Sequence, residues 1–190
     1  MPKKLILLIG APGSGKTTDA KLIAEKHSTT MSSYSTGELI KKEITNETAI
    51  GNISNNFVKK GDLVPTAIVV DIIVDAIKNA PTDIVLLDGF PGKEKELKYF
   101  CDFIFNNDEI RLLSVIEVKV SESLAKERSL AVGLSEEIFE HKMKSYTAAL
   151  NEIEEHYEDK NILKVIDGEK DLDTVVANID SYLKNIHVTG

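Results

Sequence analysis

Residues 3–17 read KKLILLIGAPGSGKT, and this stretch decides how the rest of the chain is interpreted. Its apolar run, Leu5–Ile9, is typical of a strand buried on both faces. Gly10 to Thr17 then follow the pattern G-x-x-x-x-G-K-[ST], and the amphipathic stretch Lys16–Lys26 indicates a helix directly after it. A strand, a glycine-bearing loop and a helix in this order predict a loop that wraps around a phosphate group.

Each residue type in this loop has its own task. Glycine lets the backbone turn tightly, so that successive N–H groups point at one phosphate. The helix that starts near Lys16 adds the positive end of its dipole. The Lys16 ammonium is expected to reach the β- and γ-phosphates, and the Thr17 hydroxyl is expected to face Mg²⁺. We therefore predict that the loop contacts a nucleoside triphosphate through Gly13, Ser14, Gly15, Lys16, Thr17 and Thr18.

Asp88 follows another fully apolar stretch, Ile84–Leu87. The carboxyl ends of neighbouring parallel strands meet at one edge of a sheet, so this carboxylate should lie near the phosphate loop. There it would hold Mg²⁺ or one of its water ligands. The alternative interpretation is an ordinary turn aspartate before Gly89.

Short apolar runs alternate with longer amphipathic stretches along the chain, which is typical of an α/β fold with a parallel sheet flanked by helices. The predicted strands are 5–9, 31–35, 84–87, 112–120 and 162–166. The predicted helices are 16–26, 66–79, 122–130, 136–159 and 171–186. With the loop motif, this pattern predicts the three-layer fold of P-loop NTPases with five parallel strands. Residues 36–65 are polar, and we expect them to form a small helical insertion that moves as a flap.

The composition argues against several classes of protein. The net charge of −8 is unlike the basic footprint of a nucleic-acid binder, although a local site can still attract a small anion. Cys101 is the only cysteine, so no disulfide forms within the chain and a reducing compartment is expected. No apolar run approaches the length of a membrane span, and 5–9 is too short for a signal-peptide core. We expect a cytoplasmic protein with neither nucleic acid nor membrane as a partner.

Four segments in order resemble the adenylate kinase family of nucleoside monophosphate kinases: GAPGSGKTT (10–18), YSTGELIK (34–41), KGDLVP (60–65) and DGFPGKEKE (88–96). Two further segments fit the same family, VIEVKVSESLAKER (115–128) and VIDGEK (165–170). The resemblance covers nearly the whole chain and implies a single domain, 1–190. It divides that domain into a core (1–35, 66–128 and 136–190), a monophosphate-binding insertion (36–65) and a short lid remnant (129–135).

The resemblance also implies an activity and a set of site residues. The reaction would be reversible transfer of a phosphoryl group from MgATP to AMP by a monomer, giving two ADP. Lys16, Asp88 and Arg128 would be catalytic. Arg128 would lie near the ATP base and phosphates, and Lys170 would lie beside the adenine through its backbone. The residues that would contact AMP are Thr36, Gly37, Lys41, Leu63, Val64, Gly89, Glu96 and Lys142.

The chain departs from the family pattern in its arginines. Only two of its 23 basic residues are arginine, Arg111 and Arg128. At four positions where the family pattern places an arginine near the transferred group, other residues stand here: Lys41, Gly92, Val132 and Lys142. The lid stretch R-x-D-D has no counterpart. Phosphoryl transfer depends mostly on positioning and charge neutralisation, and an arginine fork grips phosphate at two points where lysine is a point charge. Three interpretations stay open: a kinase of reduced activity, an ATP-binding protein with negligible activity, or a kinase for another acceptor.

Glu96 bears on the identity of the acceptor. The family commonly has at this position a glutamine that contacts the edge of the AMP base. An ionised carboxylate only accepts hydrogen bonds, whereas a glutamine also donates them. If Glu96 faces the base, it would suit the two donors of guanine better than the donor and acceptor of adenine. The alternative interpretation is a solvated helix glutamate within the run KEKE.

Overall fold

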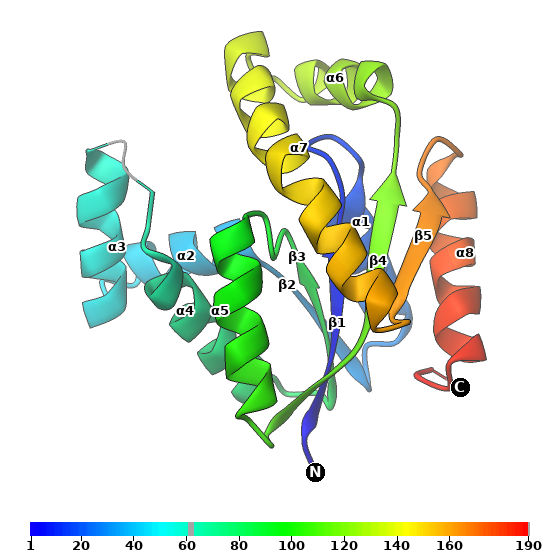
Figure 1. Cartoon of the computed structure of the whole chain (residues 1–190), viewed down its shortest axis with the longest axis horizontal. Coiled ribbons are helices and arrows are strands. Elements are labelled where there is room, and N and C mark those ends of the chain that lie inside the picture. Colours follow the sequence, from blue (N-terminus) through cyan, green and yellow to red (C-terminus); the bar gives the residue numbers. More distant parts are fainter. Residues whose placement is uncertain (61–62, 190) are drawn as a thin grey trace.

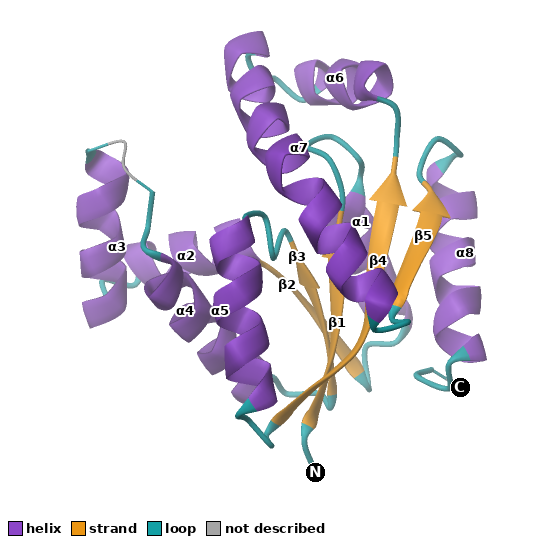
Figure 2. Ribbon diagram, in the orientation of Figure 1, coloured by secondary structure: helices purple, strands orange, loops and turns teal. Residues whose placement is uncertain are grey.

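A five-stranded parallel sheet forms the centre of the computed structural model, which describes residues 1–60 and 63–189 (Figures 1 and 2). Its order is β2-β3-β1-β4-β5, and every neighbouring pair is parallel. The strands are β1 (Lys3–Ile9), β2 (Met31–Ser35), β3 (Ile84–Asp88), β4 (Ile110–Lys119) and β5 (Leu163–Asp167). The sequence prediction of fold class and strand number is therefore confirmed.

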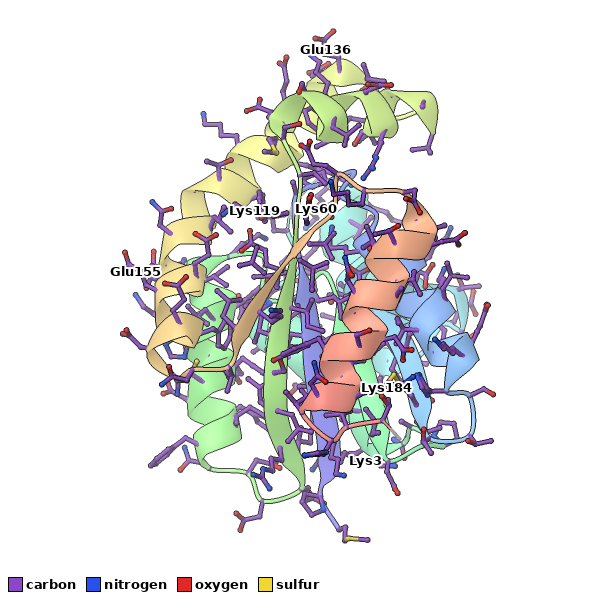
Figure 3. All side chains as sticks on the ribbon, turned by 90° about the vertical axis from the view of Figure 1, so that its right-hand side faces the viewer. Lys3, Lys60, Lys119, Glu136, Glu155 and Lys184 are labelled. Atoms are coloured by element: carbon purple, nitrogen blue, oxygen red, sulfur yellow. The ribbon has the colours of Figure 1, made fainter. Side chains whose placement is uncertain are left out.

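The helices cover the sheet on both faces (Figure 2). They are α1 (Lys16–Lys26), α2 (Thr36–Thr45), α3 (Ala49–Lys59), α4 (Thr66–Lys78), α5 (Glu94–Phe105), α6 (Glu122–Ala131), α7 (Glu136–Asp159) and α8 (Leu172–Asn185). Side chains alternate along β1, so Leu5 and Leu7 join one core with α4, α5 and α7, while Ile6 and Leu8 join another with α1 and α8. The charged side chain of Glu155 on α7 is exposed and projects away from the sheet (Figure 3).

The structure contains one helix that the sequence pattern did not predict, and one helix that ends later than predicted. Residues 94–105 form α5, whose charged start, EKELK, hides the helical spacing of its buried residues Leu97 and Phe100. Helix α6 extends through Ala131, one residue beyond the predicted end. A four-residue connection, 132–135, then leads to α7. It contains Gly133, whose φ is 90°, and it ends at Ser135, whose hydroxyl caps α7 by accepting a hydrogen bond from the Ile138 amide at 3.3 Å.

The insertion 36–65 contains two helices as far as the described residues extend. Helices α2 and α3 pack against each other to one side of the sheet (Figure 1). Thr48 caps α3 by accepting a hydrogen bond from the Gly51 amide at 3.0 Å. Among the described residues, no helix combines the length and the apolar character needed to cross a membrane.

Candidate active site

The loop between β1 and α1 is held in one shape by close packing on its neighbours. Gly13 and Gly15 have φ angles of 80° and 91°, which L-residues with a side chain rarely adopt. A Cβ atom at Gly13 would also collide with the Ala125 carbonyl oxygen and lie 2.5 Å from the Ser129 hydroxyl, both on α6. The loop conformation is therefore set by the backbone and by α6 rather than by flexible side chains.

Lys16 directs its ammonium group back over this loop. The Nζ atom lies 3.3 Å from the carbonyl oxygen of Ala11. Burial lowers the pKa of Lys16, the negative charge of Asp88 opposes that shift, and the positive charge of Lys142 adds to it. The ammonium is thus partly desolvated and repelled by the charge of Lys142 on α7. Both effects favour the binding of a polyanion beside it.

Asp88 lies at the carboxyl end of β3, beside Leu8 of β1 and Ser35 of β2. Its side chain is buried, and one carboxylate oxygen accepts a hydrogen bond from the Thr17 hydroxyl. The other oxygen, Oδ1, has no hydrogen-bond partner among the described residues. Burial raises the pKa of Asp88, while Lys16 and the Thr17 hydroxyl oppose the shift. A hydroxyl and an unsatisfied carboxylate oxygen side by side are the oxygen donors that suit Mg²⁺.

Asp19 is a site residue that the sequence did not reveal. Its place in the first turn of α1 indicates only a favourable contact with the helix dipole. In the structure its side chain is buried, and its Oδ2 atom has no partner among the described residues. Burial raises the pKa of Asp19 to about 6, with Arg128 opposing the shift and Asp88 adding to it. A second buried carboxyl group therefore lies at the start of α1, within reach of the charges of Arg128 and Asp88.

Arg128 ties the phosphate loop to the turn after β5. Its Nη1 atom lies 3.4 Å from the carbonyl oxygen of Ser14 and 3.1 Å from that of Gly168. Lys170 follows in the same turn, exposed, with its ammonium 4.0 Å from Asp167. Both residues predicted at the ATP base are thus associated with the turn after β5, since Arg128 bonds to it and Lys170 belongs to it.

A cleft of about 380 Å³ opens between the loop, the end of β3 and α7. It brings together Lys16, predicted at the triphosphate, with Leu63, Gly89 and Lys142, predicted at the monophosphate. Gly89 has φ of 81° and open space where a side chain would be. The remaining lining residues are Ile9, Gly10, Pro12, Pro91, Gly92, Lys93, His141, Ser145 and Tyr146.

A second cleft, of about 390 Å³, lies on the α6 side of Lys16. Val132 lines it and is 85% exposed, and Lys142 borders both clefts. Gly92 and Val132, two of the positions where the resemblance leads us to expect arginine, therefore border open space beside Lys16. Lys93 lines the first cleft together with Lys142, so it is a lysine that can replace part of the charge of the missing arginine at position 92.

The other residues predicted at the monophosphate are more dispersed. The Thr36 hydroxyl donates to the Asp88 carbonyl oxygen at 3.2 Å, and Gly37 faces open space. Lys41 is exposed on α2, and Val64 packs against the main hydrophobic core. Of the residues predicted at the monophosphate, Leu63, Gly89 and Lys142 line the clefts around Lys16. The clefts are not lined by Thr36, Gly37, Lys41, Val64 or Glu96.

Glu96 is turned back toward the loop that precedes α5. It is 9% exposed, and its Oε2 atom accepts a hydrogen bond from the Gly92 amide at 2.7 Å. The interpretation of Glu96 as a solvated helix glutamate is therefore wrong. Its contact with a base stays a prediction.

The fold and this site define a nucleotide-binding protein of the P-loop class. The model of the adenylate kinase family matches residues 8–162 of the chain. An adenylate kinase of a Sulfurovum species is 45% identical, covering 95% of this chain and 98% of its own. Those of a Nitratiruptor species and of Campylobacter jejuni are 45% and 43% identical, covering 95% and 97% of this chain and 95% and 98% of their own. The chain belongs to the adenylate kinase family of phosphotransferases.

Proposed function

We propose that this chain catalyses reversible transfer of the γ-phosphoryl group of MgATP to AMP, giving two ADP. One observation supports the proposal most directly. Lys16, which is expected at the triphosphate, shares one cleft with Leu63, Gly89 and Lys142, which are expected at the monophosphate. Phosphoryl transfer requires both substrates to lie in line in one space, and the protein contributes mainly positioning and charge.

On the ATP side, the proposed contacts follow the loop. The backbone amides of residues 13–18 and the Lys16 ammonium would hold the phosphates, Arg128 would lie near the base and phosphates, and the backbone at Lys170 would face the adenine. Lys16, Asp88 and Arg128 are the proposed catalytic residues. On the acceptor side, the proposed residues are Thr36, Gly37, Lys41, Leu63, Val64, Gly89, Glu96 and Lys142.

Thr17 and Asp88 are the residues we propose to hold Mg²⁺, Asp88 through water. The buried Asp88 Oδ1 atom that lacks a partner supports this assignment. When bound with ATP, Mg²⁺ neutralises negative charge on the phosphates. The protein contribution is to keep the Thr17 hydroxyl and the Asp88 carboxylate together at the loop before ATP arrives.

We further propose that turnover is slow. Residues 36–65 would close over AMP, but the lid remnant 129–135 is partly helix α6 and leaves only 132–135 to cover ATP. Lys93 and Lys142 would supply point charges in place of guanidinium forks. The chain would act as a monomer in a reducing compartment such as the cytoplasm.

A coupled assay run in both directions tests this proposal, with thermal melting followed in parallel. We expect ADP to form from ATP and AMP, and ATP and AMP to form from ADP. The Lys16→Ala variant, purified identically, controls for contaminating host kinase. If ATP raises the melting temperature while the wild-type rate equals that of Lys16→Ala, the chain is an ATP-binding protein without turnover.

A second acceptor is worth testing because Glu96 is buried beside Gly92, which lines the cleft. We expect AMP to be the best acceptor among the four nucleoside monophosphates. We also expect Glu96→Gln to raise kcat/KM for AMP relative to GMP by about tenfold, since a glutamine can both donate and accept. An unchanged ratio would mean that Glu96 only anchors the loop through the Gly92 amide.

A further inference from the structure

The first cleft is lined by four basic side chains and, among the described residues, by no carboxylate. The basic residues are Lys16, Lys93, His141 and Lys142. Tyr146 is the other ionisable residue in the described lining. The chain as a whole carries a net charge of −8, so the cleft opposes the charge of the protein and attracts anions. His141 is the one basic residue of the four to which the proposed function assigns no task.

His141 reaches this cleft from the exposed face of α7. Lys142, the next residue, and Ser145, one turn later, line the cleft from the same helix. Lys142 also borders the second cleft, whereas His141 borders only the first, which contains Leu63 and Gly89. In the described part of the chain, no ion pair involves His141. The imidazole therefore lies on the acceptor side of the site and is accessible to an anionic ligand.

The titratable groups near His141 come from four parts of the described chain. They are Glu137, Glu140, Lys142, Lys144 and Tyr146 on α7, Lys16 at the start of α1, Lys93 before α5 and Lys126 on α6. The Glu140 carboxylate lies 3.7 Å from the Lys126 ammonium, and neither Glu140 nor Glu137 lines the cleft. A phosphate group that enters the cleft therefore brings negative charge to the imidazole, and negative charge favours the protonated form of histidine.

On the basis of the proposed function, on which this inference rests, we propose that His141 binds the phosphate of AMP as an imidazolium, so that AMP binding takes up a proton. An imidazolium donates from both ring nitrogens and adds a charge to those of Lys93 and Lys142. Of the basic residues at this cleft, histidine is the type whose charge ordinarily changes between about pH 5 and 8. AMP binding is therefore tighter at the acid end of this range. MgATP binding does not share this dependence, because His141 borders only the acceptor side.

Titration calorimetry of AMP into the full-length protein at about pH 6 and about pH 8 tests this proposal, because it measures binding without turnover. We expect His141→Asn to raise the dissociation constant about fivefold at the lower pH and less than about twofold at the higher pH. His141→Lys keeps a cation at both pH values, so it should bind AMP more tightly than the wild type at the higher pH. His187→Asn, the same change at an exposed histidine outside both clefts, is the control and should match the wild type.

Proton uptake gives a second readout, which a merely structural role of His141 would not change. Repeating the titration at about pH 7 in buffers of different ionisation enthalpy gives the number of protons bound together with AMP. The phosphate of AMP contributes equally in every variant, so the wild type should take up more protons than His141→Asn or His141→Lys. Equal proton uptake in the three proteins would overturn the proposal. Equal AMP dissociation constants for the wild type and His141→Asn at the lower pH would also overturn it.

These outcomes can be told apart from a failure of the proposed function. If AMP binding shows the expected dependence on His141 while the wild-type rate equals that of Lys16→Ala, the proposed function alone is contradicted. If the wild type turns over and AMP binding does not depend on His141, the inference alone is contradicted. If the wild type binds no AMP at either pH, both are contradicted.

Discussion

The two sides of Lys16 are built in different ways. On the triphosphate side, glycine conformations and backbone amides shape the loop, and Arg128 ties it to the turn after β5. On the acceptor and lid side, the cleft borders are side chains on exposed segments, such as Val132, or positions with none, such as Gly92. Substitutions on the triphosphate side alter the backbone and therefore disturb the fold. Substitutions at exposed side chains on the acceptor side alter the chemistry of the cleft and leave the fold intact.

Because of this difference, we expect substitutions on the two sides to affect ATP binding and phosphoryl transfer separately. Gly13 cannot carry a side chain without pressing on α6, so substitution there costs stability as well as ATP affinity. A Cβ atom at Gly92 would find its nearest neighbour, Glu96 Oε2, at 3.6 Å, an ordinary contact. We therefore expect residues on the acceptor side to tune turnover while ATP affinity and stability stay nearly constant.

Replacing Lys16 with alanine should produce the largest effect. In the proposed mechanism its partly desolvated ammonium neutralises charge on the transferred group, and removing such a preorganised group costs about 10²–10³ in kcat. The rise in melting temperature with ATP should shrink as well, as measured by thermal shift. Lys4→Ala, at an exposed position near the opposite end of β1, is the matched control and should change neither. Unchanged ATP affinity in Lys16→Ala would contradict the assignment of the whole loop.

Introducing Gly92→Arg and Val132→Arg together should increase turnover. Both positions border open space beside Lys16, and an arginine that reaches the transition state can contribute about 10³–10⁵ in rate. Because neither arginine is preorganised here, we expect a gain in kcat of about tenfold. The control pair Tyr99→Arg and Leu172→Arg adds equal charge at exposed positions away from the clefts. If kcat also increased in the control pair, the increase would come from long-range electrostatics and not from arginines at the cleft.

Changing Lys142 should have a smaller effect, because lysine is a single point charge at the border of two open clefts. Lys142→Ala should lower kcat/KM about tenfold, equivalent to roughly 1.4 kcal/mol of transition-state stabilisation. Lys142→Arg should match or exceed the wild type, since a fork can replace the point charge. Lys144→Ala, exposed on the same helix, is the control. Equal kinetics for Lys142→Ala and Lys144→Ala would place Lys142 outside the reaction.

The sequence predicted the fold and the triphosphate side because the rules involved are local or topological. The loop pattern fixes the residues from Gly10 to Thr17, and parallel strands bring Asp88 to the same edge. Asp19 and Glu96 were missed or misjudged because their burial depends on packing between distant elements. Nothing in the local pattern at Asp19 shows that its carboxyl group is buried at the loop. Nothing in KEKE shows that Glu96 turns back to the Gly92 amide.

Glu117 shows the same limit in the middle of the sheet. It stands in VIEVKV, which predicts a strand and says nothing about the fate of its charge. The side chain is 0% exposed, and neither carboxyl oxygen has a hydrogen-bond partner among the described residues. Burial and the nearby Glu154 raise the pKa of Glu117 to about 7, while Lys119 and Tyr146 oppose the shift. Tyr146 also lines the cleft, so a buried acid lies close behind the acceptor side.

Replacing Glu117 with glutamine should leave turnover almost unchanged and alter the pH dependence of stability. Between pH 4.5 and about 7 the folded state keeps the proton on Glu117 that the unfolded state has lost. The unfolding free energy of the wild type should therefore fall as pH rises through this window, by up to about 3 kcal/mol, and the loss should be complete above it. Glu117→Gln has no proton to lose, so its urea-unfolding free energy should be flatter across the same range.

Measuring kcat at pH 7 for Glu117→Gln sharpens the comparison between the two sides of Lys16. Glutamine has the shape of the protonated acid, and Tyr146 stands as a neighbour of both Glu117 and the cleft. Suppose that kcat is unchanged while the unfolding free energy becomes less dependent on pH. Slow turnover would then arise only from the side chains that border the clefts. If kcat changes together with stability, the sheet interior beneath α7 also positions the acceptor side. The contrast between a backbone-built side and a side-chain-built side would then no longer hold.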